Sequence, residues 1–146
     1  MTNVGRLKIL IVLFLLPKVA RSYEQLLIGD EHVHLIIDIC KFYGSKSIIF
    51  SYSKFKEMEM TTTMFKWTRI LSREGLTSTT FYFSDLHKSM YYANRVVQPH
   101  YIVIISNHND INEFSLVTNN FDMTFSIWVV LFIYEGHDPD YCHNPP

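Results

Sequence analysis

The loop at 136–143 (GHDPDYCH) carries the densest group of chemically capable side chains in this 146-residue chain. Four of its side chains are of the types that bind zinc in proteins: His137, Asp138, Cys142 and His143. Their spacing matches no structural zinc pattern, and Pro139 limits how they can converge on one ion. We therefore expect no metal at this loop, and no cofactor elsewhere in the chain.

A second set of polar residues follows three apolar segments that have the composition of strands. These residues are Ser51 and Ser53, then Ser84, then Ser106 and Asn107. In an open parallel sheet, ligands bind in the crevice beyond the carboxyl ends of the strands. The candidate ligand-binding residues for a small anion or amino acid, helped by helix N-termini, are therefore Ser53, Ser84, Ser106 and Asn107. The alternative is that they cap those helices, which accounts for them adequately.

Motifs of several enzyme classes are absent from the sequence. No G-x-G-x-x-G or G-x-x-x-x-G-K-[ST] stretch for nucleotide binding occurs. The G-x-S-x-G elbow of α/β-hydrolases is missing too. Because no nucleophile–base pair or carboxylate pair stands out, we expect a protein that is not an enzyme.

Two long amphipathic segments in the first half of the chain are predicted to be helices. The first begins at Gly29-Asp30 and ends at Gly44, a residue type that favours helix ends. The second covers residues 54–74. Its apolar face, with spacings of four, three and four, consists of Met60, Met64, Trp67 and Leu71.

Two further helices are predicted in the second half. Ser84 is expected to cap one that ends before Pro99. The apolar face of that helix would consist of Leu86, Met90, Ala93 and Val97. A capping box, Asp110-x-x-Glu113, is expected to open the last and shortest helix.

Between and after these helices lie four segments rich in β-branched and aromatic residues. They cover 47–52, 79–83, 101–105 and the apolar run Phe125–Tyr134. Strands without strict alternation are buried on both faces, as in a parallel sheet covered by helices. The order predicts an α/β fold with a parallel sheet of about four strands and helices on both faces. The order of the strands in the sheet stays open.

Residues 1–22 have the organisation of a secretory signal peptide. A basic segment precedes the apolar stretch Ile9–Leu16, and small residues follow at Ala20 and Ser22, before a cut ahead of Tyr23. Eight apolar residues are too few to span a bilayer, which takes about 20 in a helix. The alternative is a buried N-terminal strand or helix. We expect a signal peptide, and with it entry into the secretory pathway.

Removal of residues 1–22 changes the charge of the chain. The full sequence has a net charge of −1, and its first 22 residues hold four basic and no acidic side chains. Residues 23–146 are left with nine basic and fourteen acidic residues, and no Lys or Arg follows Arg95. A nucleic-acid-binding protein needs a basic surface to neutralise phosphates. We therefore exclude nucleic acid as a partner.

The two cysteines are expected to behave differently. Cys40 lies within an apolar helical pattern and is interpreted as a small buried hydrophobic residue. Cys142 lies in a polar loop, and in an exported protein such a thiol favours a disulfide. We expect its partner to lie outside this sequence.

The end of the chain resembles the insect ionotropic receptors, which are divergent chemosensory relatives of the ionotropic glutamate receptors. The residues that carry the resemblance are Phe121-Asp122-Met123, Trp128–Phe132 (WVVLF) and, above all, Gly136–Pro146 (GHDPDYCHNPP). The match is strongest over 119–146. Upstream, only the signal peptide and the α/β alternation agree with the family.

The resemblance implies a role for residues 23–146. They would form one extracellular lobe of a bilobed, periplasmic-binding-protein-like domain, incomplete at its C-terminus, in a ligand-gated cation channel. The lobe would lie at the extracellular face of the plasma membrane as part of a longer receptor, or be secreted if the chain ends at Pro146. Its partners would be other receptor subunits or the ligand-binding domain, and Cys142 would pair with a cysteine beyond Pro146. Ligand-gating residues and pore helices would lie outside this chain, so none are transferred.

An alternative from another class stays open. The chain could be a freestanding secreted α/β domain that binds a small polar molecule through Ser53, Ser84, Ser106 and Asn107.

Overall fold

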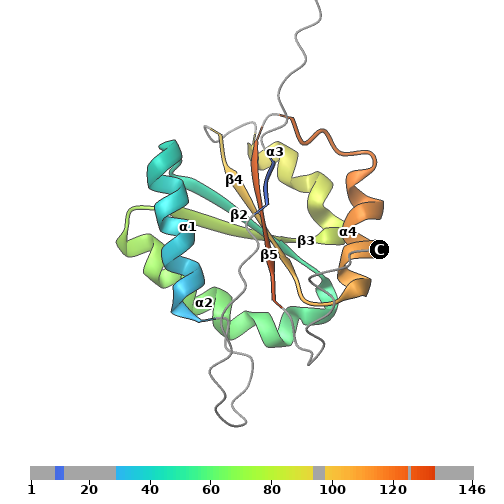
Figure 1. The fold of residues 1–146 in the computed structure, drawn as a ribbon, viewed down its shortest axis with the longest axis horizontal. Helices are drawn as coiled ribbons and strands as arrows, with labels where there is room; N and C mark the ends of the chain where they lie inside the picture. Colours follow the sequence, from blue (N-terminus) through green and yellow to red (C-terminus); the bar gives the residue numbers. More distant parts are fainter. Residues whose placement is uncertain (1–8, 12–28, 94–97, 125, 134–146) are drawn as a thin grey trace, which may run out of the picture.

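The computed structural model describes residues 9–11, 29–93, 98–124 and 126–133. Helices, 3-10 turns (η) and strands follow one another along the chain (Figure 1). They are β1 (Ile9–Ile11), α1 (Asp30–Tyr43), β2 (Ser47–Tyr52), η1 (Lys54–Lys56), α2 (Glu57–Arg73), β3 (Thr77–Tyr82), η2 (Phe83–Lys88), α3 (Ser89–Ala93), β4 (His100–Ile105), α4 (His108–Thr118) and β5 (Ile127–Phe132).

The five strands form one sheet in the order β1-β5-β4-β2-β3, and all of its neighbouring strands run parallel. Figure 1 shows α1 and α2 on one side of this sheet and α3 and α4 on the other. The predicted fold class, a parallel sheet with helices on both faces, is confirmed. The sheet has one strand more than expected, β1.

The layer of α1 and α2 covers one face of the sheet. Val33, Ile36 and Cys40 of α1 pack with the α2 residues that were predicted from their spacing. Those α2 residues, Met60, Met64, Trp67 and Leu71, are all buried. The helices meet alternate strand residues such as Phe50, Ile102 and Val129. Gly44 ends α1 with a φ of 70°, a backbone conformation that glycine adopts without a steric penalty.

The opposite face of the sheet packs against η2, α3 and α4. Its strand residues are those in between, including Ile49, Tyr101 and Trp128. The rings of Tyr101 and Trp128 stack with their centroids 4.0 Å apart. Strands whose successive side chains enter different cores cannot show alternation, which explains the continuous apolar runs in the sequence.

The predicted third helix is wrong in its type and its phase. Residues 83–88 form a 3-10 turn, and only Ser89–Ala93 is α-helical. The buried residues Phe83, Leu86 and Ser89 are three apart, which is the period of a 3-10 helix. Met90, predicted to face the core, is therefore 41% exposed. Val97 lies outside the described residues.

The predicted start of the last helix is also wrong. α4 begins at His108, and Asn107 caps it by accepting a hydrogen bond from the backbone N–H of Asp110 at 3.0 Å. Asp110 is thus the third residue of the helix rather than its cap. Asparagine can cap a helix as well as aspartate can, and the Asp110 side chain is held by another contact.

The N-terminal strand β1 pairs with β5, with Ile9 opposite Trp128 and Ile11 opposite Val130. This arrangement corresponds to the alternative of an N-terminal strand. The assignment of residues 1–22 as a cleaved signal peptide stays a prediction. Its removal would leave β5 at the edge of the sheet.

Candidate functional site

The connections of the sheet change direction between β2 and β4. The chain leaves β2 through α2 toward β3, whereas it leaves β4 through α4 toward β5 on the opposite face. In α/β proteins, a crevice forms at such a point, beyond the carboxyl ends of the two strands. Three of the four candidate residues, Ser53, Ser106 and Asn107, follow these two strands directly.

Ser53 lies at this switch point, directly after β2. Its side chain is 1% exposed, and its hydroxyl donates a hydrogen bond of 2.6 Å to Oε2 of Glu113 on α4. Ser53 precedes η1 but makes no capping hydrogen bond through its side chain. The hydroxyl therefore joins β2 to α4 across the switch point, which is a contact that capping does not explain.

Ser106 and Asn107 hold the start of α4. The backbone N–H and the hydroxyl of Ser106 both donate to Oδ2 of Asp110, at 2.8 and 2.6 Å. Asp110 is 4% exposed, so these hydrogen bonds compensate for the burial of a carboxylate. Together with the Asn107 cap, they make the β4–α4 turn a closed set of hydrogen bonds. The capping interpretation holds for Asn107.

Ser84 is not joined to this group. It lies inside η2, it is exposed, and the residue before the turn is Tyr82. The predicted cap at Ser84 is therefore wrong. Ser84 follows β3, which is separated from β4 by β2, so the structure brings together Ser53, Ser106 and Asn107 but not Ser84.

One buried hydroxyl near the end of β2 has no hydrogen-bond partner among the described residues. Ser51 is fully buried two residues before Ser53, and no hydrogen bond to its Oγ is present among the described residues. Its neighbours across the sheet are Val103 and Phe81, so its surroundings are apolar. An unpaired buried hydroxyl costs about 1–3 kcal/mol relative to a paired one.

The carboxylates are the residues that sequence reasoning missed. Asp110 and Glu113 were interpreted as a capping box, yet both accept hydrogen bonds from strand-end serines. A third carboxylate at this edge, Glu57, accepts a hydrogen bond from the Tyr82 hydroxyl at 2.6 Å, which raises the pKa of Tyr82 to about 12. The available signal was the spacing: two acidic residues follow the serine and asparagine at the end of an apolar strand, with no cation after Arg95.

Cys40 has the environment that was predicted. It is a free, fully buried thiol in α1, and burial raises its pKa to about 11. A thiol with such a pKa is protonated at neutral pH and is a poor nucleophile. The interpretation as a buried hydrophobic residue is confirmed.

Within the described part of the chain, no group of three or more His, Cys, Asp or Glu side chains is placed to hold a metal ion. The loop at 136–143 and Cys142 lie outside the described residues, so the expectations about zinc and about a disulfide stay predictions. No helix among the described residues is long and apolar enough to cross a membrane.

Comparison with known proteins yields no relative: no protein family, curated protein or solved structure matches the chain.

Proposed function

We propose that residues 23–146 are the N-terminal extracellular lobe of a chemosensory ionotropic receptor, with a role in folding, assembly or modulation. The observation that carries the proposal is the run Gly136–Pro146 (GHDPDYCHNPP), which resembles that family. A parallel α/β sheet with a switch point agrees with one lobe of a periplasmic-binding-protein-like domain. A shared fold class alone would not indicate a function.

The hydrogen bonds at the switch point agree with a scaffold role for this lobe. Ser53, Ser106 and Asn107 already hold partners within the chain, and the contacts of Ser53 and Ser106 are as short as 2.6 Å. A ligand that used these groups would have to replace those hydrogen bonds. The lobe would therefore support assembly, while ligand gating would belong to the receptor's ligand-binding domain.

The test is the messenger RNA that encodes the chain, read beyond the codon for Pro146. The proposal predicts coding sequence for ligand-binding halves and pore helices, and a cysteine able to pair with Cys142. A stop codon directly after Pro146 in every transcript would overturn the receptor proposal for this chain.

A second candidate function is that of a secreted domain that binds a small polar molecule. The unpartnered Ser51 hydroxyl and the nearby Asp110 and Glu113 favour it. On the α4 side, Asp110 and Glu113 offer carboxylates to an amine, whereas on the β2 side Lys54 and Lys56 follow Ser53 directly, so amines and acids are both tested. Binding would break the Ser53–Glu113 hydrogen bond and free that carboxylate to hold the ammonium group.

A thermal-shift screen separates this candidate from the first. Small amines and matched carboxylic acids would be added to the purified chain and to the Glu113→Gln variant, which keeps an acceptor but loses the charge. An amine at a concentration one hundred times its Kd would add about 2.7 kcal/mol of stability to the wild type. The same amine should have little effect on the variant. No shift with any amine would reject this candidate.

A further inference from the structure

The edge of the sheet formed by β3 lacks the residues that usually prevent an edge strand from pairing with another chain. β3 is the last strand in the order β1-β5-β4-β2-β3, so only its β2 side is paired. Its sequence, TSTTFY, contains no charge, proline or glycine. Proteins protect exposed edges from pairing with other chains by such residues or by covering elements, and TSTTFY contains none of these residues.

The backbone groups that face outward can be identified from one hydrogen bond. The N–H of Thr77 donates to the carbonyl of Lys46, directly before β2, at 2.9 Å. Backbone groups along a strand alternate in direction, so Thr79 and Phe81 also point toward β2. The N–H and C=O groups of the remaining three residues therefore point away from the sheet. These residues are Ser78, Thr80 and Tyr82.

Helix α2 lies over β2 and β3. The hydroxyls of Thr68 and Ser78 are 3.2 Å apart, Glu57 accepts from Tyr82, and the ring of Trp67 lies 5.8 Å from that of Phe50. Phe65 lies between Thr61 and Thr68 on the helix surface, toward the β3 edge. Its side chain is 74% exposed, and that of Met58, seven residues earlier on the same side, is 91% exposed.

We propose that β3 pairs antiparallel with β3 of a second copy of this chain, around a two-fold axis at Thr80, so that the α2 helices pack through Phe65 and Met58. In this register, Ser78 faces Tyr82 of the second copy and Thr80 faces Thr80, so all three outward residues find partners. A two-fold axis perpendicular to the sheet keeps each helix layer on its own side.

Simple dimensions support this arrangement. Neighbouring strands lie about 4.8 Å apart, and an α2 placed midway over β2 and β3, both of which it contacts, would lie about 5 Å from the two-fold axis. The two α2 axes would then lie about 10 Å apart, which is within the usual distance for packed helices. Phe65 and Met58 would fill this gap, and their exposure in the single chain would be explained.

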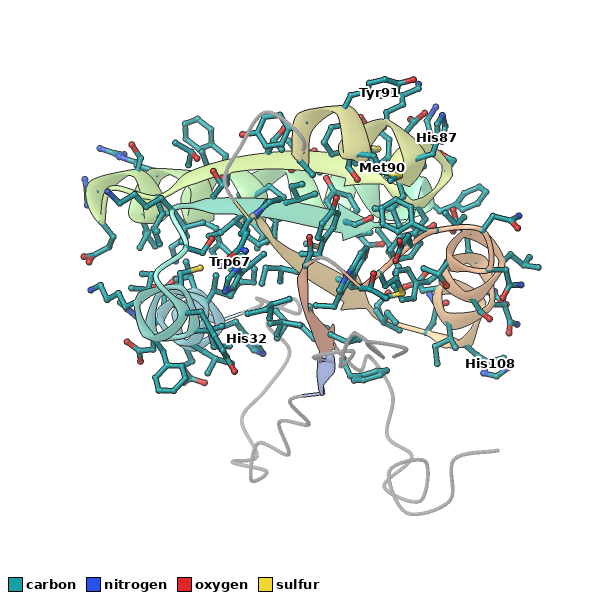
Figure 2. All side chains as sticks on the ribbon, turned by 90° about the horizontal axis from the view of Figure 1, so that it is seen from above. His32, Trp67, His87, Met90, Tyr91 and His108 are labelled. Carbon is teal, nitrogen blue, oxygen red and sulfur yellow. The ribbon has the colours of Figure 1, made fainter. Side chains whose placement is uncertain are left out.

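The charges of α2 also favour an antiparallel second copy. Its first turn carries Glu57 and Glu59, and its C-terminal half carries Arg69 and Arg73. These two arginines make no ion pair within the described part of the chain. An antiparallel partner brings its first turn beside these arginines, and of the two carboxylates there Glu59 is already paired with Lys56, which leaves Glu57 to face them. On the other face, Figure 2 shows Tyr91 projecting on the β3 side of the molecule, where a second copy would add further apolar contact.

The test is the mass of the purified chain in solution across the micromolar range, measured by sedimentation velocity. The expected result is a monomer–dimer equilibrium. Phe65→Glu should weaken dimerisation about tenfold or more, because it removes a central apolar side chain and adds a charge. Thr80→Pro removes an outward N–H without breaking a bond to β2, and it should weaken dimerisation similarly.

The matched control is Phe42→Glu, which changes an 82% exposed phenylalanine at the end of α1, away from the proposed interface. It should leave the dimer unchanged. Circular dichroism would check that each variant is folded. If Thr80→Pro unfolds, hydrogen exchange at Ser78, Thr80 and Tyr82 replaces it, and these amides should be better protected at high concentration. A chain that stays monomeric, a dimer that survives Phe65→Glu, or equal weakening by Phe42→Glu would each overturn the proposal.

Discussion

The two helix layers hold the same sheet by different means. In α1 and α2, the buried residues are almost all aliphatic or aromatic. In α4, the only buried residue is a carboxylate, Asp110, and the apolar residues Ile111, Phe114 and Val117 are only partly buried. The α1–α2 layer is therefore attached by apolar packing. On the other face, Phe83 and Leu86 of η2 are fully buried, whereas α4 is attached by strand-end hydrogen bonds together with half-buried aromatic contacts.

The difference matters for function because polar contacts can be exchanged for a ligand or a partner, whereas a close-packed apolar layer cannot be separated without a large cost. The α1–α2 layer is expected to act as the rigid part of the fold. The α4 layer, with Ser53 and Glu113 at the switch point, is the part where rearrangement is least costly.

The largest expected effect is the contrast between two truncations to alanine, one in α2 and one in α4. Leu71→Ala in α2 removes a completely buried side chain and should lower the free energy of unfolding by about 2–5 kcal/mol. Val117→Ala in α4 removes a partly buried one and should cost about 1 kcal/mol or less. Urea unfolding of both variants measures the difference. Equal losses would show that the two layers are packed alike.

A smaller effect is expected from the polar attachment of α4. Asp110→Ala leaves the Ser106 N–H and hydroxyl without their acceptor and should cost about 1–3 kcal/mol. Asp110→Asn keeps an acceptor oxygen and should cost less. The same urea titration compares them. If Asp110→Ala were neutral, the hydrogen bonds at the β4–α4 turn would not be what attaches this layer.

The pH dependence of the apolar layer gives a third prediction. His100 is 3% exposed beside Tyr43, and burial lowers its pKa, although the backbone at Gln98 opposes this shift. Above the ordinary pKa of about 6.5, the imidazole is neutral in both the folded and the unfolded chain, so its titration does not change the free energy of unfolding. Below it, the unfolded chain binds the proton first, so stability falls with pH until the folded pKa is reached. The loss between pH 7 and pH 5 should be smaller in His100→Gln than in the wild type, and an unchanged loss would contradict the assignment.

The smallest effect is expected for the exposed ion pairs between α1 and α2. Lys41 Nζ and Glu74 Oε2 lie 2.8 Å apart. Glu74 raises the pKa of Lys41, and Lys41 lowers the pKa of Glu74, so both shifts favour the charged pair. Both side chains are exposed, and solvent screens such pairs strongly. Lys41→Ala should therefore leave the urea midpoint almost unchanged. A large loss would mean that surface charges, and not apolar packing, hold this layer.

The sequence predicted those elements whose signal is local. The apolar spacing in α2, the glycine after α1 and the continuous apolar runs of β2 and β4 each depend on neighbours along the chain, and they are confirmed. The strand order, the pairing of β1 with β5 and the Ser53–Glu113 contact join residues far apart in sequence, so no local pattern could indicate them. The third helix was misjudged because Leu86 and Met90 fit an α-helical period, while Phe83, Leu86 and Ser89 fit the 3-10 period that the chain adopts.

The most direct test of the receptor proposal is the N-terminal sequence of the protein after expression of all 146 residues in insect cells. An extracellular lobe must enter the secretory pathway, and the account predicts a product in that pathway that begins at Tyr23. A cytosolic product that keeps residues 9–11, which pair with β5 as strand β1, would contradict it.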